Sequence, residues 1–83
     1  MDQEIDLLQD FSADCRMRGL AEVSIESYVA RIRHFVEFLE ARDKEPALAD
    51  RLDIRDYVEQ LRGRGNTSKT IRLTLTAISS FYE

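Results

Sequence analysis

Residues 19–39 read GLAEVSIESYVARIRHFVEFL, and residues 65–82 read GNTSKTIRLTLTAISSFY. Each segment passes from a glycine-led polar turn into apolar residues at three- and four-residue steps, which is the spacing of an amphipathic helix. Ser24 is the predicted N-cap of the first helix, and Thr67 or Ser68 that of the second, because short hydroxyl side chains satisfy the unbonded N–H groups at a helix start.

Two more helices complete the predicted fold. One covers roughly residues 3–18 and ends at Gly19, and a shorter one runs from an Asp53 cap to Leu61. No segment alternates apolar and polar residues as a strand does. We therefore expect a single all-α domain over residues 1–83, a compact four-helix bundle with no sheet and with its longest helix ending near Arg42. The predicted inward residues are Ile5, Leu8, Phe11 and Cys15; Ile25, Tyr28, Val29, Ile32, Phe35, Val36 and Leu39; Ile54, Tyr57, Val58 and Leu61; Ile71, Leu75, Ile78 and Tyr82, with Thr70, Thr74, Ala77 and Phe81 on the adjoining face of the last helix.

The composition excludes several functional classes. A chain of 83 residues forms a core too small for a large internal active site. Its single cysteine, Cys15, has no partner for an internal disulfide, and with one histidine, His34, it cannot build a metal site, so we expect Cys15 to fill the core. No apolar run approaches the ~20 residues of a membrane helix, and the N-terminus is acidic. We expect a cytoplasmic domain with no cofactor, no metal and no membrane partner.

The net charge is −4, but acidic and basic residues are unevenly distributed along the chain. An acidic protein is a poor candidate for nucleic acid, because Lys and Arg drive phosphate binding. Five of the sixteen acids, however, lie within residues 2–14, before the first basic residue. The segment 62–72 contains Arg62, Arg64, Lys69 and Arg72 and no acid, and it surrounds the turn into the last helix.

The outward faces of the two quoted helices carry the candidate functional residues. Helical geometry leaves the residues opposite each apolar stripe exposed. The start of the last helix, at Thr67, Ser68 and Lys69, is a candidate phosphate seat in addition to its capping role, because unbonded N–H groups and the helix dipole favour anions there. The predicted outward residues are Glu26, Ser27, Ala30, Arg33, His34 and Glu37, with Arg31 at the flank, and Lys69, Arg72, Leu73, Thr76 and Ser80.

An ordered set of motifs extends from Phe11 to Tyr82. A glycine is followed by Ser and Tyr, a helix ends in Phe-x-x-Phe-Leu, a short helix follows, and a Gly-x-x-Ser/Thr-x-x-Ile turn leads to a helix ending Phe-Tyr. These elements are Gly19, Ser24, Tyr28, Phe35, Phe38-Leu39, Ile54 to Leu61, Gly65, Ser68-Lys69-Thr70-Ile71 and Phe81-Tyr82. The set resembles the N-terminal, SAM-like core-binding domain of tyrosine recombinases, the phage integrase family.

The resemblance implies a DNA clamp whose second and fourth helices lie at the major groove of a recombination site. It implies double-stranded DNA, a C-terminal catalytic domain of the parent chain and other recombinase protomers as partners. The catalytic constellation is absent from these residues, so we expect no enzymatic activity from this chain. The residues expected to contact DNA are Ser27, Arg31, Arg33, Arg64, Thr67, Ser68, Lys69, Arg72 and Thr76.

The sequence departs from the family pattern at two places, and two other functional classes remain open. The positions after Arg72 are Leu73 and Thr74, where basic or amide residues are frequent in the family, and Glu26 is an acid on the expected DNA side. Tyr28, Tyr57 and Tyr82 are predicted to be core residues rather than nucleophiles. The alternatives are a SAM-like protein-interaction module, which an exposed apolar patch would favour, and a helix-turn-helix regulator.

Overall fold

The computed structural model describes residues 2–82, and the side chains of residues 6–82, so the side chains of Asp2, Glu4 and Ile5 lie outside the described residues. Within residues 2–82 the chain forms four α-helices, one short 3-10 helix and no strand, which confirms the all-α prediction. The helices are α1 Asp2–Met17, α2 Glu22–Ala41, η1 Pro46–Leu48, α3 Arg51–Gly63 and α4 Ser68–Phe81.

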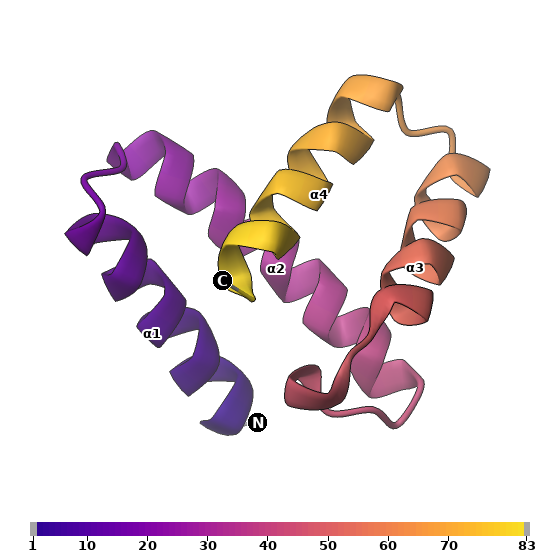
Figure 1. Cartoon of the computed structure of the whole chain (residues 1–83), viewed down its shortest axis with the longest axis horizontal. Helices are drawn as coiled ribbons and strands as arrows, with labels where there is room; N and C mark the ends of the chain where they lie inside the picture. Colours follow the sequence, from indigo (N-terminus) through magenta and orange to yellow (C-terminus); the bar gives the residue numbers. More distant parts are fainter. Residues whose placement is uncertain (1, 83) are drawn as a thin grey trace.

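The longest helix of the described chain, α2, supports the other elements. It packs most extensively against α1 on one side and α4 on another. Figure 1 shows α4 crossing in front of α2, with α3 returning beside them and joined to α4 by a short turn. The molecule measures 34 × 28 × 19 Å. No helix within the described residues is long and apolar enough to cross a membrane.

Two of the predicted helix caps are wrong. The helix α2 begins before Ser24, with Ala21 as its N-cap, because Gly19 turns the chain at a positive φ of 83° and the helical hydrogen bond from the Ile25 N–H to the Ala21 carbonyl already forms. The N-cap of α3 is Asp50 rather than Asp53. Asp53 takes the third helical position, where its carboxylate accepts from the Asp50 N–H while its own N–H donates to Asp50, a reciprocal capping box.

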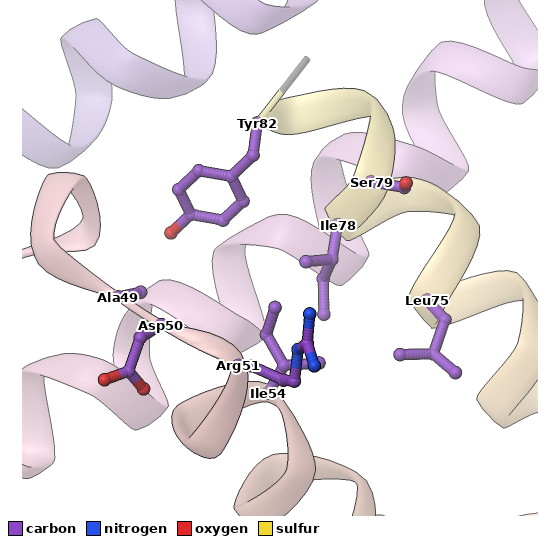
Figure 2. Close-up of a pocket in the computed structure, with 8 residues that line it drawn as sticks. All are labelled: Ala49, Asp50, Arg51, Ile54, Leu75, Ile78, Ser79 and Tyr82. Atoms are coloured by element: carbon purple, nitrogen blue, oxygen red, sulfur yellow. The ribbon is translucent and has the colours of Figure 1, made fainter.

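The orientation of α4 also differs from the prediction. Leu75 and Tyr82 were expected inward, yet they are 38% and 40% exposed, and Figure 2 shows both beside an open pocket. Ser80 was expected outward, yet it is buried, and its hydroxyl accepts a 2.8 Å hydrogen bond from Arg18. The reason is that the small side chains of Thr74 and Ala77, both buried, let α4 approach α2 closely with this side turned inward.

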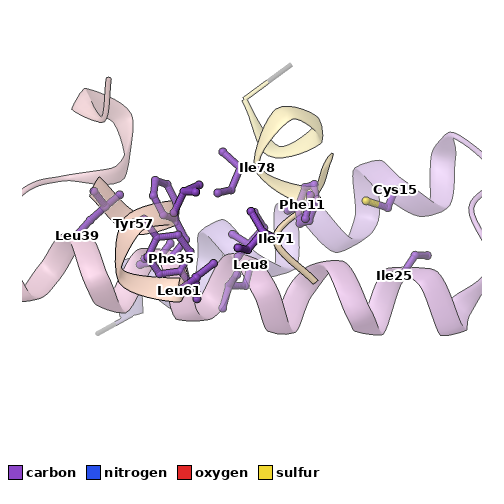
Figure 3. Close-up of a cluster of buried hydrophobic side chains, with 14 residues drawn as sticks. Leu8, Phe11, Cys15, Ile25, Phe35, Leu39, Tyr57, Leu61, Ile71 and Ile78 are labelled. Atoms are coloured by element: carbon purple, nitrogen blue, oxygen red, sulfur yellow. The ribbon is translucent and has the colours of Figure 1, made fainter. Parts of the chain in front are cut away.

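The core is one apolar cluster centred on α2. Phe35 is fully buried, and its ring centroid lies 5.2 Å from that of Tyr57 and 6.3 Å from those of Phe38 and Tyr82. Figure 3 shows the cluster extending along α2 from Leu39 to Cys15. Cys15 is fully buried as predicted, and burial raises the pKa of its thiol. The buried hydrophobic residues are Leu8, Phe11, Cys15, Ile25, Ile32, Phe35, Val36, Leu39, Tyr57, Val58, Leu61, Ile71, Ala77 and Ile78.

Candidate nucleic-acid interface

The turn between α3 and α4 sets the position at which α4 begins. Gly65 adopts a positive φ of 87°, a conformation that glycine accepts without steric penalty. Asn66 then closes the end of α3, because its backbone N–H and its side-chain amide both donate to the Leu61 carbonyl at 3.1 Å. Thr67 follows as the N-cap, which confirms one of the two predicted caps for α4.

The first turn of α4 has the features of an anion seat. The Thr67 hydroxyl oxygen accepts from the Thr70 N–H at 3.3 Å. The N–H groups of Ser68 and Lys69 precede the first helical hydrogen bond and therefore have no helical acceptor. Thr67, Ser68 and Lys69 are all exposed, and no acid lies in this first turn. A phosphate oxygen placed here would meet two N–H donors, the helix dipole and a lysine ammonium.

Four residues form the exposed outer face of α4: Lys69, Arg72, Leu73 and Thr76. The Thr76 hydroxyl donates to the Arg72 carbonyl at 3.0 Å, so its proton is already used within the helix. Lys69 and Arg72 form no ion pair with any described residue. The face is therefore cationic at its N-terminal end, and Leu73 and Thr76 follow the two charges.

On α2, Arg31 extends toward α4. One guanidinium nitrogen, Nη1, donates to the Thr74 hydroxyl at 3.1 Å, and the buried Nε has no hydrogen-bond partner among the described residues. Ser27 is exposed and lies one helical turn before Arg31. This flank of α2 contributes a cation and a hydroxyl beside α4.

Arg33 projects from a different flank of α2. It follows Arg31 by two residues, about 200° around the helix, so it points away from the contact with Thr74. Glu26 precedes Arg33 by seven residues and shares its flank to within about 20°. The structure thus brings Arg31 to α4 but not Arg33, and it places the acid Glu26 with Arg33 rather than with Arg31.

Arg64 is the C-cap of α3. A hollow of about 310 Å³ between α2 and α3 is lined by Arg64, Gln60 and Tyr57 on α3 and its C-cap, and by His34 on α2, among others. His34 follows Ser27 by seven residues and so shares its flank of α2. Gln60 was not singled out from the sequence, because nothing in the spacing of α3 indicated which polar residues would line this hollow.

The basic residues divide into two groups of six. All twelve lie within the described side chains, and six of them pair with acids: Arg16, Arg18, Arg42, Lys44, Arg55 and Arg62. The other six form no ion pair with a described residue, and they are Arg31, Arg33, Arg51, Arg64, Lys69 and Arg72. Five of these six are the cations that the sequence predicted to contact DNA. The sixth, Arg51, lies at the opposite end of α3 from Arg64.

Two of the paired cations, Arg42 and Lys44, belong to a cluster of ion pairs between the end of α2 and the start of α3. The Asp53 carboxylate is 3% exposed, and Lys44 Nζ lies 2.6 Å from its Oδ2. The Lys44 hydrogen bond, together with the Asp50 N–H, lowers the pKa of Asp53, and the same bond raises the pKa of Lys44. Arg42 lies 3.1 Å from Asp56 and reaches the edge of this cluster. No group of three or more metal-ligating side chains occurs among the described residues.

An apolar groove lies on another side of the molecule. It has a volume of about 690 Å³ and runs between the start of α3 and the second half of α4 (Figure 2). Ile54, Leu75, Ile78 and Tyr82 supply its apolar lining, and Arg51 also lines it. An exposed apolar surface of this kind is the feature that the protein-interaction alternative requires.

Residues 7–83 match the family described as phage integrase, N-terminal SAM-like domain. The chain therefore belongs to this family, which is consistent with a tyrosine recombinase as the parent protein. No curated protein and no solved structure matches it significantly.

Proposed function

We propose that this chain is the DNA-binding clamp domain of a site-specific tyrosine recombinase and acts in DNA integration and recombination in the cytoplasm. The observation that carries the proposal is the division of the cations. Basic side chains on ordinary protein surfaces readily pair with nearby acids, and half of the basic residues here do so. Those left unpaired gather mainly at α4, at the turn before it and at the facing flank of α2, where phosphates would replace acids as their partners.

The proposed contacts follow from the position of each side chain. The N–H groups of Ser68 and Lys69 bind one phosphate, with Thr67 holding the helix start in place. Lys69, Arg72 and Thr76 lie on the face of α4 that enters the major groove. Ser27 and Arg31 reach the backbone from α2, and Arg64 reaches it from the turn. Arg33 contacts only DNA that wraps around to its own flank of α2, so we expect it to contribute less than Arg31.

We propose that the domain performs no strand cleavage itself and that a C-terminal catalytic domain of the parent chain supplies this chemistry, with other protomers assembling on the same site. Tyr82 has the wrong surroundings for a nucleophile. Its hydroxyl donates to the Pro46 carbonyl at 2.7 Å, and burial, with a smaller effect from Asp53, raises its pKa to about 12. A phosphoryl-transfer tyrosine needs instead a cationic environment that stabilises its phenolate.

The test is a titration of fluorescent duplex DNA across a salt series. Each neutralised phosphate adds roughly −0.9 to the slope of log affinity against log salt, so three to five contacts predict a slope of about −3 to −5. Lys69→Ala and Arg72→Ala should each flatten the slope by about one unit. Arg51→Ala is the matched control, because it removes an equally unpaired cation from the groove side and should leave the slope nearly unchanged.

Three results would contradict this proposal. Affinity that ignores salt would mean that phosphate contacts do not drive binding. Equal effects of Arg51→Ala and Arg72→Ala would mean that only the total charge matters and that α4 holds no special position. Absence of binding to any duplex would favour the protein-interaction alternative, for which the apolar groove is the candidate surface.

A further inference from the structure

The outer face of α4 lacks the side chains that usually read adenine and cytosine in DNA. Residues 68–82 contain no Asn, Gln, Asp or Glu. Adenine is usually read by the amide of Asn or Gln, and cytosine by a carboxylate. Neither contact is available from α4. The remaining means of readout are the cationic donors of Lys69 and Arg72, which suit guanine, hydroxyl groups, which do not discriminate strongly, and apolar groups, which suit the methyl group of thymine.

Leu73 is the large apolar side chain exposed on the outer face of α4. It is 39% exposed and lies between Lys69 and Thr76, and the three residues fall within an arc of about 60° on the helix. Leu75 is almost equally exposed, at 38%, but it belongs to the wall of the apolar groove with Ile78. The exposed surface of Leu73 has no such apolar surroundings on the outer face and is instead flanked by charges and a hydroxyl.

Thr76 adds a second methyl group beside it. Because its hydroxyl proton is donated to the Arg72 carbonyl, the side chain has no proton to offer a base acceptor. What it can present is a methyl group and an acceptor oxygen. Leu73 and Thr76 together therefore form a small apolar surface that follows the cations Lys69 and Arg72 along α4.

We propose that Leu73, with the Thr76 methyl group beside it, contacts the C5-methyl group of thymine in the major groove and so contributes to sequence specificity. The inference rests on the proposed function, since it assumes that α4 enters the groove. It adds a preference that phosphate contacts cannot supply, because they carry no sequence information. The thymine methyl is the group that a leucine can recognise without any hydrogen bond.

The experiment begins with selection of preferred duplexes from a random-sequence pool by the purified chain. The most enriched duplex is then remade with uracil in place of each thymine, which removes only the methyl groups. Loss of one buried methyl contact should weaken binding by about fourfold. This exchange leaves the protein unchanged, so it does not depend on the folding of any variant.

Two variants assign the effect to its residue. Leu73→Ala should lose most of the preference for the thymine duplex, whereas the matched control Leu75→Ala should keep the wild-type difference of about fourfold. Thermal unfolding of both variants verifies that they are folded.

The inference is overturned if wild type does not distinguish the two duplexes, or if Leu73→Ala keeps the full wild-type preference. In either case a steep salt dependence would leave the proposed function standing. Failure to bind any duplex would remove both.

Discussion

Replacing Phe35 by alanine tests how the fold is held together. Its ring is fully buried and lies within 6.3 Å of three other aromatic rings, those of Tyr57, Phe38 and Tyr82. Truncation of a buried phenylalanine lowers the free energy of unfolding by about 3–5 kcal/mol through lost transfer energy and cavity formation. The three aromatic contacts place Phe35→Ala at the upper end, about 4–5 kcal/mol. A domain of this size has only about 4–12 kcal/mol in total, so the variant should be at the limit of folding.

Urea denaturation followed by far-UV circular dichroism measures this loss, with Phe38→Ala as the control. Phe38 lies on the same helix but is only partly buried, with the Arg42 guanidinium 5.1 Å from its ring centroid. Its truncation should lower the free energy of unfolding by about 1–2 kcal/mol. A loss below about 1 kcal/mol in Phe35→Ala, or an equal loss in both variants, would refute the assignment of Phe35 to the centre of the core.

Three further predictions concern single polar groups. Lys44 lowers the pKa of Asp53 in the folded protein, so the contribution of this carboxylate to stability is complete above the unfolded value of about 3.9 and is lost as pH falls through the lower folded value. Asp53→Asn should therefore reduce the fall in the free energy of unfolding at acidic pH. An unchanged fall at acidic pH would contradict the ion pair. Thr67→Ala removes the α4 cap and should lower the free energy of unfolding by about 1 kcal/mol, whereas Thr67→Ser should retain most of it. Tyr82→Phe loses one hydrogen bond to the Pro46 carbonyl, so urea melts should show a loss of about 0.5–1 kcal/mol; neither wild type nor variant should nick supercoiled DNA, and nicking that disappears in Tyr82→Phe would overturn the reading of this residue.

Sequence periodicity located the helices, but not the starts of α2 and α3 or the rotation of α4. The apolar stripe of α2 consists of seven residues between positions 25 and 39, and its members Ile32, Phe35 and Leu39 were correctly predicted as core. The α4 stripe was ambiguous, because threonine and alanine are small enough to face either way. Thr74 and Ala77 proved to be the close-packed side, and this rotation exposed Leu75. Amphipathicity reports which residues are apolar, whereas tertiary packing decides which of two adjoining faces is buried.

The cap errors have a related cause. Ser24 and Asp53 are both good N-cap residues in isolation, and each has a neighbour that begins the helix earlier. Asp50 precedes Asp53 by three residues, and the pair forms a capping box in which the second acid occupies the third helical position. Sequence reasoning considered one acid and overlooked the spacing of the two. The η1 turn at Pro46–Leu48, which positions Asp50, was not predicted at all.

Only part of the candidate interface could be predicted from the sequence. Residue type and helical position were enough to propose Lys69, Arg72 and the α4 start from sequence. The ion pairs, by contrast, join residues whose proximity only the fold reveals, as when Lys44 from the loop after α2 meets Asp53 on α3. The separation of Arg31 from Arg33 likewise required knowing which flank of α2 faces α4, a fact that the Arg31–Thr74 hydrogen bond supplies.

The net charge of −4 is compatible with the DNA-facing surface proposed for α4, because no acid lies in the segment 62–82. At physiological salt an exposed charge is screened beyond about 8 Å, a fraction of the 34 Å length of this molecule. The exposed acids Asp6 and Asp10 on α1 then act only on their own surroundings, and a duplex at α4 meets Lys69 and Arg72 first. At about 0.01 M salt the screening length grows to roughly 30 Å, so the whole acidic molecule would repel the duplex. The plot of log affinity against log salt should therefore bend and flatten at the lowest salt, which simple counterion release from a basic protein would not produce.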